Sequence, residues 1–152
     1  MHHPQHGIGK VKSIRKRSFY GAAAATYAEV FFARDKLTLT VLEKDLKKTV
    51  REPISAKQAK RLLEELRQWS GKPSSQWKTR ANAHQAALDR GDPFEYAKVF
   101  KGLSQLEAEG ALRAQDRAHL NQSLDLLTEE LAHSLGKTSE QARNLLAQAS
   151  GE

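Results

Sequence analysis

Trp77 lies in a polar, cationic stretch, residues 72–80 (KPSSQWKTR), that contains no other large apolar residue. An aromatic ring flanked by cations can unstack bases while the cations neutralise phosphate. Lys72, Lys78 and Arg80 supply the cations of this stretch. The segment therefore predicts an exposed nucleic-acid contact at the start of a helix. The alternative is a Trp that folds back onto a neighbouring helix, because most Trp side chains are largely buried.

The net charge of +7 is concentrated in the first two thirds of the chain. Residues 1–52 carry 11 Lys and Arg against 5 Asp and Glu, and residues 53–90 carry 8 against 3, whereas residues 91–152 carry 6 against 10. A positive field of this extent attracts polyanions or an acidic protein surface. An excess of Lys and Arg over Asp and Glu, taken alone, also fits ribosomal and membrane-surface proteins.

Residue patterns typical of enzymes and metal sites are weak in this chain. Gly7 and Gly9 lack the third glycine of a nucleotide-binding fingerprint and lead into a strand rather than a helix. The absence of Cys excludes disulfides and thiolate chemistry. The six His residues have no zinc-ligand spacing with carboxylates, and we expect them to be exposed or capping residues. They are His2, His3, His6, His84, His119 and His133. We predict a protein that is not an enzyme, with no catalytic residue, metal or cofactor.

A length of 152 residues allows one sizeable core or two small ones. No segment approaches the roughly 18 consecutive apolar residues of a membrane span, and the N-terminus lacks the apolar stretch of a signal peptide. The absence of Cys also fits a reducing compartment. We therefore expect a cytoplasmic protein.

The first part of the chain has the composition of β-structure. Three short runs rich in β-branched and aromatic residues predict strands at residues 8–14, 27–32 and 37–42. A hairpin connection is expected at residues 20–25 and a second turn at residues 33–36. Alternation in the third run places Leu37, Leu39 and Val41 on one face. A strand meander of this size favours a small half-open barrel.

The second part of the chain has helical periodicity throughout. Ser55 is the expected N-cap of a first helix, which ends before Gly71 and Pro73. Its apolar face consists of Leu62, Leu63, Leu66 and Trp69. A second helix is expected over residues 75–89, and it stops at a glycine that allows a left-handed turn, Gly91.

Three further helices are predicted after this glycine. Asp92 and Pro93 are the expected cap and first residue of a helix that continues to about residue 109. A longer helix over residues 114–135 carries a stripe of leucines that suits core packing rather than a zipper. The stripe consists of Leu120, Leu124, Leu127, Leu131 and Leu135. Thr138, with Gln141 three residues later, begins the last helix.

Four segments spread over almost the whole chain resemble segments of a known family. They are residues 3–11 (HPQHGIGKV), 36–41 (KLTLTV), 76–80 (QWKTR) and 90–97 (RGDPFEYA). The first two are similar to strands of the RNA polymerase-interaction domain that the CarD/CdnL family of bacterial transcription regulators shares with the transcription-repair coupling factor. The third resembles the Trp segment of that family, and the fourth resembles the start of its next helix.

The resemblance implies an α+β protein with two domains. Residues 1–52 are expected to form a Tudor-like half-open β-barrel that interacts with RNA polymerase. Residues 53–152 are expected to form a compact all-α, DNA-binding domain of about five helices. The resemblance further implies docking on the polymerase β subunit through Arg15 and Arg17 on one strand with Leu39 and Thr40 on another.

The same resemblance implies a role for the Trp segment at promoters. Trp77 is expected to enter the minor groove of promoter DNA at the upstream edge of the melted region, with little sequence specificity. Lys78 and Arg80, together with Lys72, are expected to hold the DNA backbone. The result is a more stable open complex. We expect a monomer that needs no membrane and no cofactor.

Two other hypotheses remain open from the sequence. A basic module of this kind also fits a ribosome- or RNA-associated protein, because small basic barrels bind folded RNA. A protein-interaction adaptor is the second possibility, since Trp and Arg are enriched in the residues that dominate protein interfaces. RNA binding without polymerase supports the first, and the absence of salt-dependent DNA binding supports the second.

Overall fold

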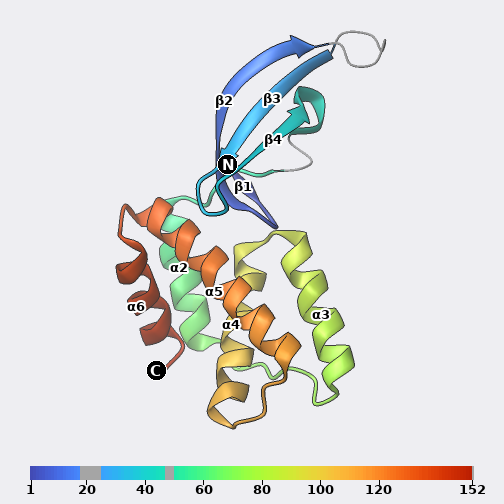
Figure 1. Ribbon diagram of the computed structural model, residues 1–152. Coiled ribbons are helices and arrows are strands. Elements are labelled where there is room, and N and C mark those ends of the chain that lie inside the picture. Colours follow the sequence, from blue (N-terminus) through green and yellow to red (C-terminus); the bar gives the residue numbers. More distant parts are fainter. Residues whose placement is uncertain (18–24, 47–49, 152) are drawn as a thin grey trace. The chain divides into compact units, whose positions relative to one another are not determined.

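The computed structural model describes residues 1–17, 25–46 and 50–151. The chain divides into two compact units, Met1–Pro53 and Ile54–Glu152. Figure 1 shows strands in the first unit and helices in the second. The predicted α+β class is confirmed, with a curled, half-open antiparallel sheet before a helical unit.

In the residues that the structure describes, the first unit forms a four-stranded antiparallel sheet in the order β1-β2-β3-β4. Its strands are β1 His2–His3, β2 Gly7–Arg17, β3 Ala25–Phe32 and β4 Leu37–Leu42. The register shifts between Val11 and Ser13, where β2 bulges against β3. A bulge bends a strand and increases its twist, which helps a small sheet to curl.

The core of the sheet unit comes largely from alternate residues of β3. Ala28, Val30 and Phe32 are buried, and they alternate with half-buried residues along the strand. Gly9 lies opposite Phe32 in the β2–β3 register. A Cβ atom at Gly9 would lie 2.5 Å from Phe32 Cε1, so the ring occupies the space that a side chain would need.

The three predicted strands are confirmed, as is the turn at residues 33–36, where Lys36 has a φ of 51°. The predicted hairpin at residues 20–25 lies mostly outside the described residues. Strand β1 was not predicted. It pairs with β2, where His2 lies opposite Ile8 and His3 opposite Gly7. His2 also forms an isolated bridge, in which His2 N donates to Arg51 O at 2.5 Å and Arg51 N donates to His2 O at 2.9 Å. The expectation that His2 is exposed or capping is wrong, because this residue is buried.

The described part of the second unit forms five α-helices. They are α2 Ala56–Gln68, α3 Trp77–Arg90, α4 Pro93–Ala108, α5 Ala114–Leu135 and α6 Ser139–Ala149. Local capping explains most of their boundaries. Ser55 and Gln58 form a capping box at α2, and Thr138 and Gln141 form one at α6.

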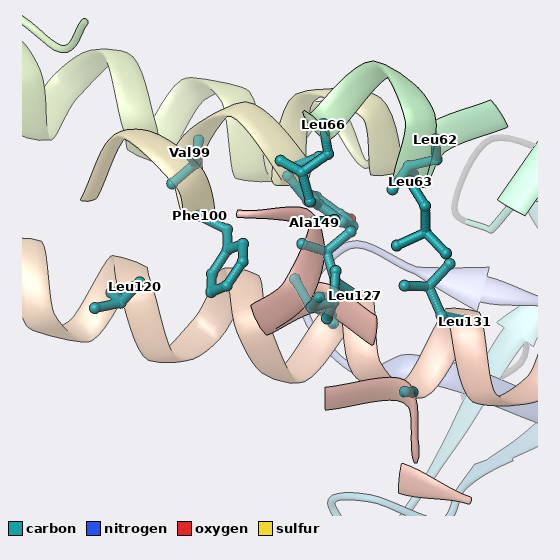
Figure 2. Packing of buried hydrophobic residues seen from close by; sticks show 14 of the residues in the cluster. Leu62, Leu63, Leu66, Val99, Phe100, Leu120, Leu127, Leu131 and Ala149 are labelled. Carbon is teal, nitrogen blue, oxygen red and sulfur yellow. The ribbon is translucent and has the colours of Figure 1, made fainter. Parts of the chain in front are cut away.

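The helices enclose one apolar core, seen from close by in Figure 2. Helix α5 packs along α4 and contacts α2, α3 and α6. Leu120, Leu127 and Leu131 of the predicted stripe are buried in this core, while Leu124 and Leu135 are partly buried against it. The stripe therefore packs inside the helical unit, as predicted. Burial of each such side chain contributes about 1.5–3 kcal/mol.

The start of the helical unit is fixed on α5. Ile54 N donates to the buried Glu130 carboxylate at 2.9 Å, and Ser134 Oγ donates to Ile54 O at 2.6 Å. The backbone N–H and C=O of Ile54 are thereby both hydrogen-bonded to side chains of α5.

In the described ranges, none of the helices combines the length and apolar character that crossing a bilayer requires.

Candidate nucleic-acid interface

Trp77 is the first residue of α3, immediately after its N-cap Gln76. The residue is 38% exposed, and among the described residues Ile14 of the sheet unit is the other large apolar residue that is exposed. The predicted exposed indole is confirmed. A contact between this ring and nucleic acid stays a prediction.

Two cations lie over the Trp77 ring. Lys78 Nζ is 5.5 Å from the ring centroid, and Arg113 Cζ is 5.3 Å from it. Both distances are within the range in which the quadrupole of an indole attracts a cation. Lys78 is the next residue in sequence, whereas Arg113 is the N-cap residue of α5. Sequence reasoning missed Arg113, because its proximity to Trp77 depends on the packing of α5 against α3.

The position of Arg80 differs from the exposed position that a phosphate contact requires. Its side chain is 5% exposed, and its Nε and Nη2 atoms donate to Asp116 Oδ1 and Oδ2 at 2.8 and 2.6 Å. Its Nη1 donates to Ser74 O at 3.0 Å. This corrects the prediction that Arg80 holds the DNA backbone, because its charge is already paired inside the protein. The hydrogen bonds from Arg80 also hold the pKa of Asp116 below its usual range.

Asp116 connects the starts of two helices. Besides the guanidinium of Arg80 on α3, its Oδ2 accepts a hydrogen bond of 3.0 Å from Arg113 N at the start of α5. A carboxylate in the first turn of a helix also interacts favourably with the helix dipole. One buried side chain thus fixes Arg113 relative to the segment that carries Trp77.

The connection between α2 and α3 is held against α4. Lys101 Nζ donates to Leu66 O at 2.5 Å and to Arg67 O at 3.1 Å, which caps the end of α2. Pro73 lies directly over Gly102, where an added Cβ atom would be 3.1 Å from Pro73 Cγ. Together with the bond from Arg80 to Ser74 O, these contacts fix the path of the connection up to Trp77.

Lys72 is exposed and lines a hollow of about 220 Å³ on the helical unit. The other lining residues are Trp69, Pro73, His84, Ala87, Arg90, Glu95, Lys98 and Val99. Trp77 does not line this hollow, and Arg90 is paired with Glu95 at 2.7 Å. The cation that the structure brings to the Trp77 ring from outside its own segment is therefore Arg113.

Two histidines contact each other near the Arg80–Asp116 pair, whose charges act on one of them, His84. The rings of His84 and His119 meet edge to face at a centroid distance of 6.2 Å, and His119 Nε2 is 3.1 Å from Gln85 Oε1. Burial, helped by His119 and Arg80, lowers the pKa of His84 to about 4. The expectation of exposed or capping histidines is wrong for the buried His119 and the half-buried His84.

The candidate docking residues of the sheet unit lie on β2 and β4. Arg15 is exposed opposite Tyr27, and Thr40 is exposed opposite Glu29. Tyr27 and Glu29 are two residues apart on β3, so Arg15 and Thr40 lie on one face of the sheet.

The other two docking candidates have different settings. Leu39 pairs with the buried Val30, so it lies on the opposite, inner face and is half-buried. Arg17 pairs with Ala25 in the backbone register, and its side chain lies outside the described residues.

No group of side chains in the described ranges has the composition and proximity of a metal site. The model of the CarD C-terminal domain matches residues 61–147, which is more than half of the chain. This chain belongs to the CarD family. A search of curated proteins found no match.

The matched region runs from α2 to α6 and contains the Trp77 segment, Arg80, Arg113 and Asp116. The resemblance to the CarD family is thereby confirmed by a match over residues 61–147. CarD proteins are transcription regulators, and membership implies an interaction with RNA polymerase.

Proposed function

We propose that this CarD protein docks on the β subunit of RNA polymerase through its sheet unit and places Trp77 in the promoter. The ring enters the minor groove at the upstream edge of the melted DNA and stabilises the open complex. The observation that carries the proposal is an exposed indole with two cations over its ring. This combination suits a groove that is lined by phosphates and contains unstacked bases.

The fixed path of the Trp77 segment supports a wedge. A side chain that holds bases apart must keep its place against the tendency of the bases to restack. The α2–α3 connection is held at Ser74 by Arg80 and at Pro73 by α4. Little of the ring's binding energy is therefore lost in ordering the segment that presents it.

Docking on polymerase makes a weak wedge effective. A second contact on the same complex raises the local concentration of the ring at the DNA, so neither contact needs to be tight alone. A base-stacking contact contributes on the order of 1–3 kcal/mol. This is enough to shift a nearly balanced melting equilibrium by about tenfold.

The sheet unit offers two features for docking. In the part of the chain that the structure describes, no strand pairs with the outer edge of β4, and such an edge can accept a strand of a partner. Arg15 and Thr40 also lie on one exposed face of the sheet. Polymerase and promoter DNA are thus the proposed partners, with no cofactor and no membrane.

The test is the lifetime of polymerase–promoter open complexes with the wild-type protein, with Trp77→Ala and without the protein. Wild type is expected to prolong the lifetime, and Trp77→Ala is expected to shorten it by about tenfold relative to wild type. Trp77→Phe keeps a ring and is expected to fall between them. If wild type has no effect, the proposal fails, and RNA or protein partners replace promoter DNA as the candidates.

A further inference from the structure

We propose that Arg113 is a further nucleic-acid-binding residue, which holds a backbone phosphate beside the bases that Trp77 separates. The inference rests on the proposed wedge and names the cation that accompanies it. The decisive feature is a guanidinium at 5.3 Å from the Trp77 ring, brought there by a different helix.

The donors of Arg113 are available for an external anion. Its side chain is exposed, and in the described ranges its guanidinium contacts the Trp77 ring without forming an ion pair with any carboxylate. Arg80, in contrast, uses its donors on Asp116 and on the carbonyl of Ser74. The positive charge that remains open next to the ring therefore belongs to Arg113 and to its neighbour Lys78.

The chemistry of the pair fits a phosphate close to a base step. An arginine can stack on an aromatic face and still direct its planar donors outward to a phosphate in bidentate geometry. A ring inserted between bases lies within reach of the phosphates of the same step. Arg113 would thus link the wedge and the strand that the wedge displaces. A lysine at this position keeps the charge but loses the stacking and the fork of donors.

Asp116 fixes Arg113 in this position. Its carboxylate accepts from the backbone N of Arg113 and also from the Arg80 side chain, which in turn holds Ser74. The beginning of α5 and the segment before Trp77 therefore share one buried anchor. Asp116 acts as a positioning residue, because it contacts Arg113 through the backbone and leaves its side chain exposed.

The chain supplies a matched control for Arg113. Arg117 lies one turn further along α5 and is also exposed, and it does not lie over the Trp77 ring. Replacing either arginine by Ala removes one positive charge from the same helix. A difference between the two variants therefore reports the position of Arg113 rather than the net charge of the protein.

The experiment measures the Kd of the full chain for a duplex with a premelted bubble over a series of KCl concentrations. Arg113→Ala is expected to weaken binding and to reduce the slope of log Kd against log salt by about 0.9, the value for one lost phosphate contact to duplex DNA. Arg113→Lys is expected to restore the slope but only part of the affinity. Arg117→Ala is expected to behave as wild type.

Trp77→Ala separates the failure of this inference from the failure of the wedge. The ring is uncharged, so its loss should weaken binding while the salt slope stays the same. If Trp77→Ala weakens binding and Arg113→Ala matches Arg117→Ala, the wedge stands and the role of Arg113 is overturned. If Trp77→Ala has no effect on binding or on open-complex lifetime, the wedge itself fails. In that case, a reduced salt slope for Arg113→Ala would identify a phosphate contact that does not depend on the ring.

A double-mutant cycle tests whether the two side chains act together. If Arg113 holds the strand that Trp77 displaces, the double variant Trp77→Ala/Arg113→Ala should lose less affinity than the product of the two single losses. Independent losses would show that Arg113 binds a phosphate elsewhere. Thermal unfolding of each variant provides the folding control, and exposed positions such as these should leave the melting temperature close to that of wild type.

Discussion

Arg80 and Asp116 form a bidentate ion pair inside the helical unit, with N–O distances of 2.8 and 2.6 Å. Both side chains are at most 5% exposed, and the pair joins the first turns of α3 and α5. Each carboxylate oxygen of Asp116 accepts a hydrogen bond from Arg80, and the remaining guanidinium nitrogen, Nη1, donates to Ser74 O. The pair therefore organises the surface that carries Trp77 and Arg113 without belonging to that surface.

Asp116→Asn is expected to destabilise the helical unit by about 3–5 kcal/mol, because it leaves the buried guanidinium of Arg80 without a counter-charge. Urea unfolding followed by Trp fluorescence measures this change. Both Trp residues of the chain, Trp69 and Trp77, lie in the helical unit, so the signal reports this unit alone.

The control for this prediction is Asp125→Asn. Asp125 pairs with Arg143 at 3.0 Å, but both side chains are about half exposed, and an ion pair of this kind contributes at most about 1 kcal/mol. Equal effects of the two substitutions would contradict the assignment of the Arg80–Asp116 pair as a structural anchor.

Arg80 also shows where sequence analysis reached its limit. Its neighbours in sequence are polar and cationic, so it was assigned to phosphate together with Lys78. Asp116, which buries it, is 36 residues away in the chain. Arg113 was missed for the same reason, because it is also distant in the chain from Trp77, whose ring it contacts. Contacts between helices depend on how their faces pack, and a polar segment does not reveal which of its cations turns inward.

Features specified by local sequence were predicted well. Ser55, Asp92 and Thr138 cap the helices that they were expected to begin, because a cap involves only the next two or three residues. The leucine stripe of α5 was likewise assigned to the core. Strand β1 was missed although it pairs with the neighbouring β2, since a strand of two residues gives no periodicity.

The stability of the helical unit is expected to fall as the pH drops from about 6.5 toward about 4. Burial lowers the pKa of His84 from 6.5 to about 4. Between these values the unfolded chain binds a proton at His84 and the folded protein does not. The stability associated with the neutral imidazole is therefore complete above the unfolded pKa and is progressively lost below it.

Urea unfolding by Trp fluorescence across this pH range measures the effect, and His84→Gln is expected to make the dependence shallower. Some dependence should remain, because the pKa of His119 is also lowered by burial. The control is His133→Gln, at an exposed position of α5, which should retain the wild-type dependence. An unchanged dependence in His84→Gln would exclude His84 as a contributor.

Gly9→Ala is expected to destabilise the sheet unit by about 1–3 kcal/mol, the usual effect of overpacking a filled core. The added Cβ atom would lie 2.5 Å from Phe32 Cε1 and 2.8 Å from Val30 Cγ1. Amide hydrogen exchange of β2 and β3 measures the loss within this unit. Gly9→Ala/Phe32→Leu should recover part of the stability, since the smaller side chain removes the closest contact. No recovery would place the strain elsewhere.

Arg15→Glu is expected to abolish capture of RNA polymerase while leaving the affinity for bubble DNA unchanged. Arg15 is exposed on β2, on the face of the sheet that also carries Thr40. A reversed charge at an interface introduces repulsion and leaves the partner's opposite charge unpaired, which together disfavour docking. The DNA contact is proposed for the other unit, so it should not respond.

Lys60→Glu makes the same change of charge at an exposed position of α2 and should leave polymerase capture intact. Comparison of the two variants separates a specific docking residue from the general loss of positive charge. Arg17→Glu, on the same strand, is expected to behave as Arg15→Glu. If both strand variants still capture polymerase, the docking surface is not on β2, and the open edge of β4 becomes the next candidate. Thr40→Pro, which removes a backbone donor from that edge strand, would then test it.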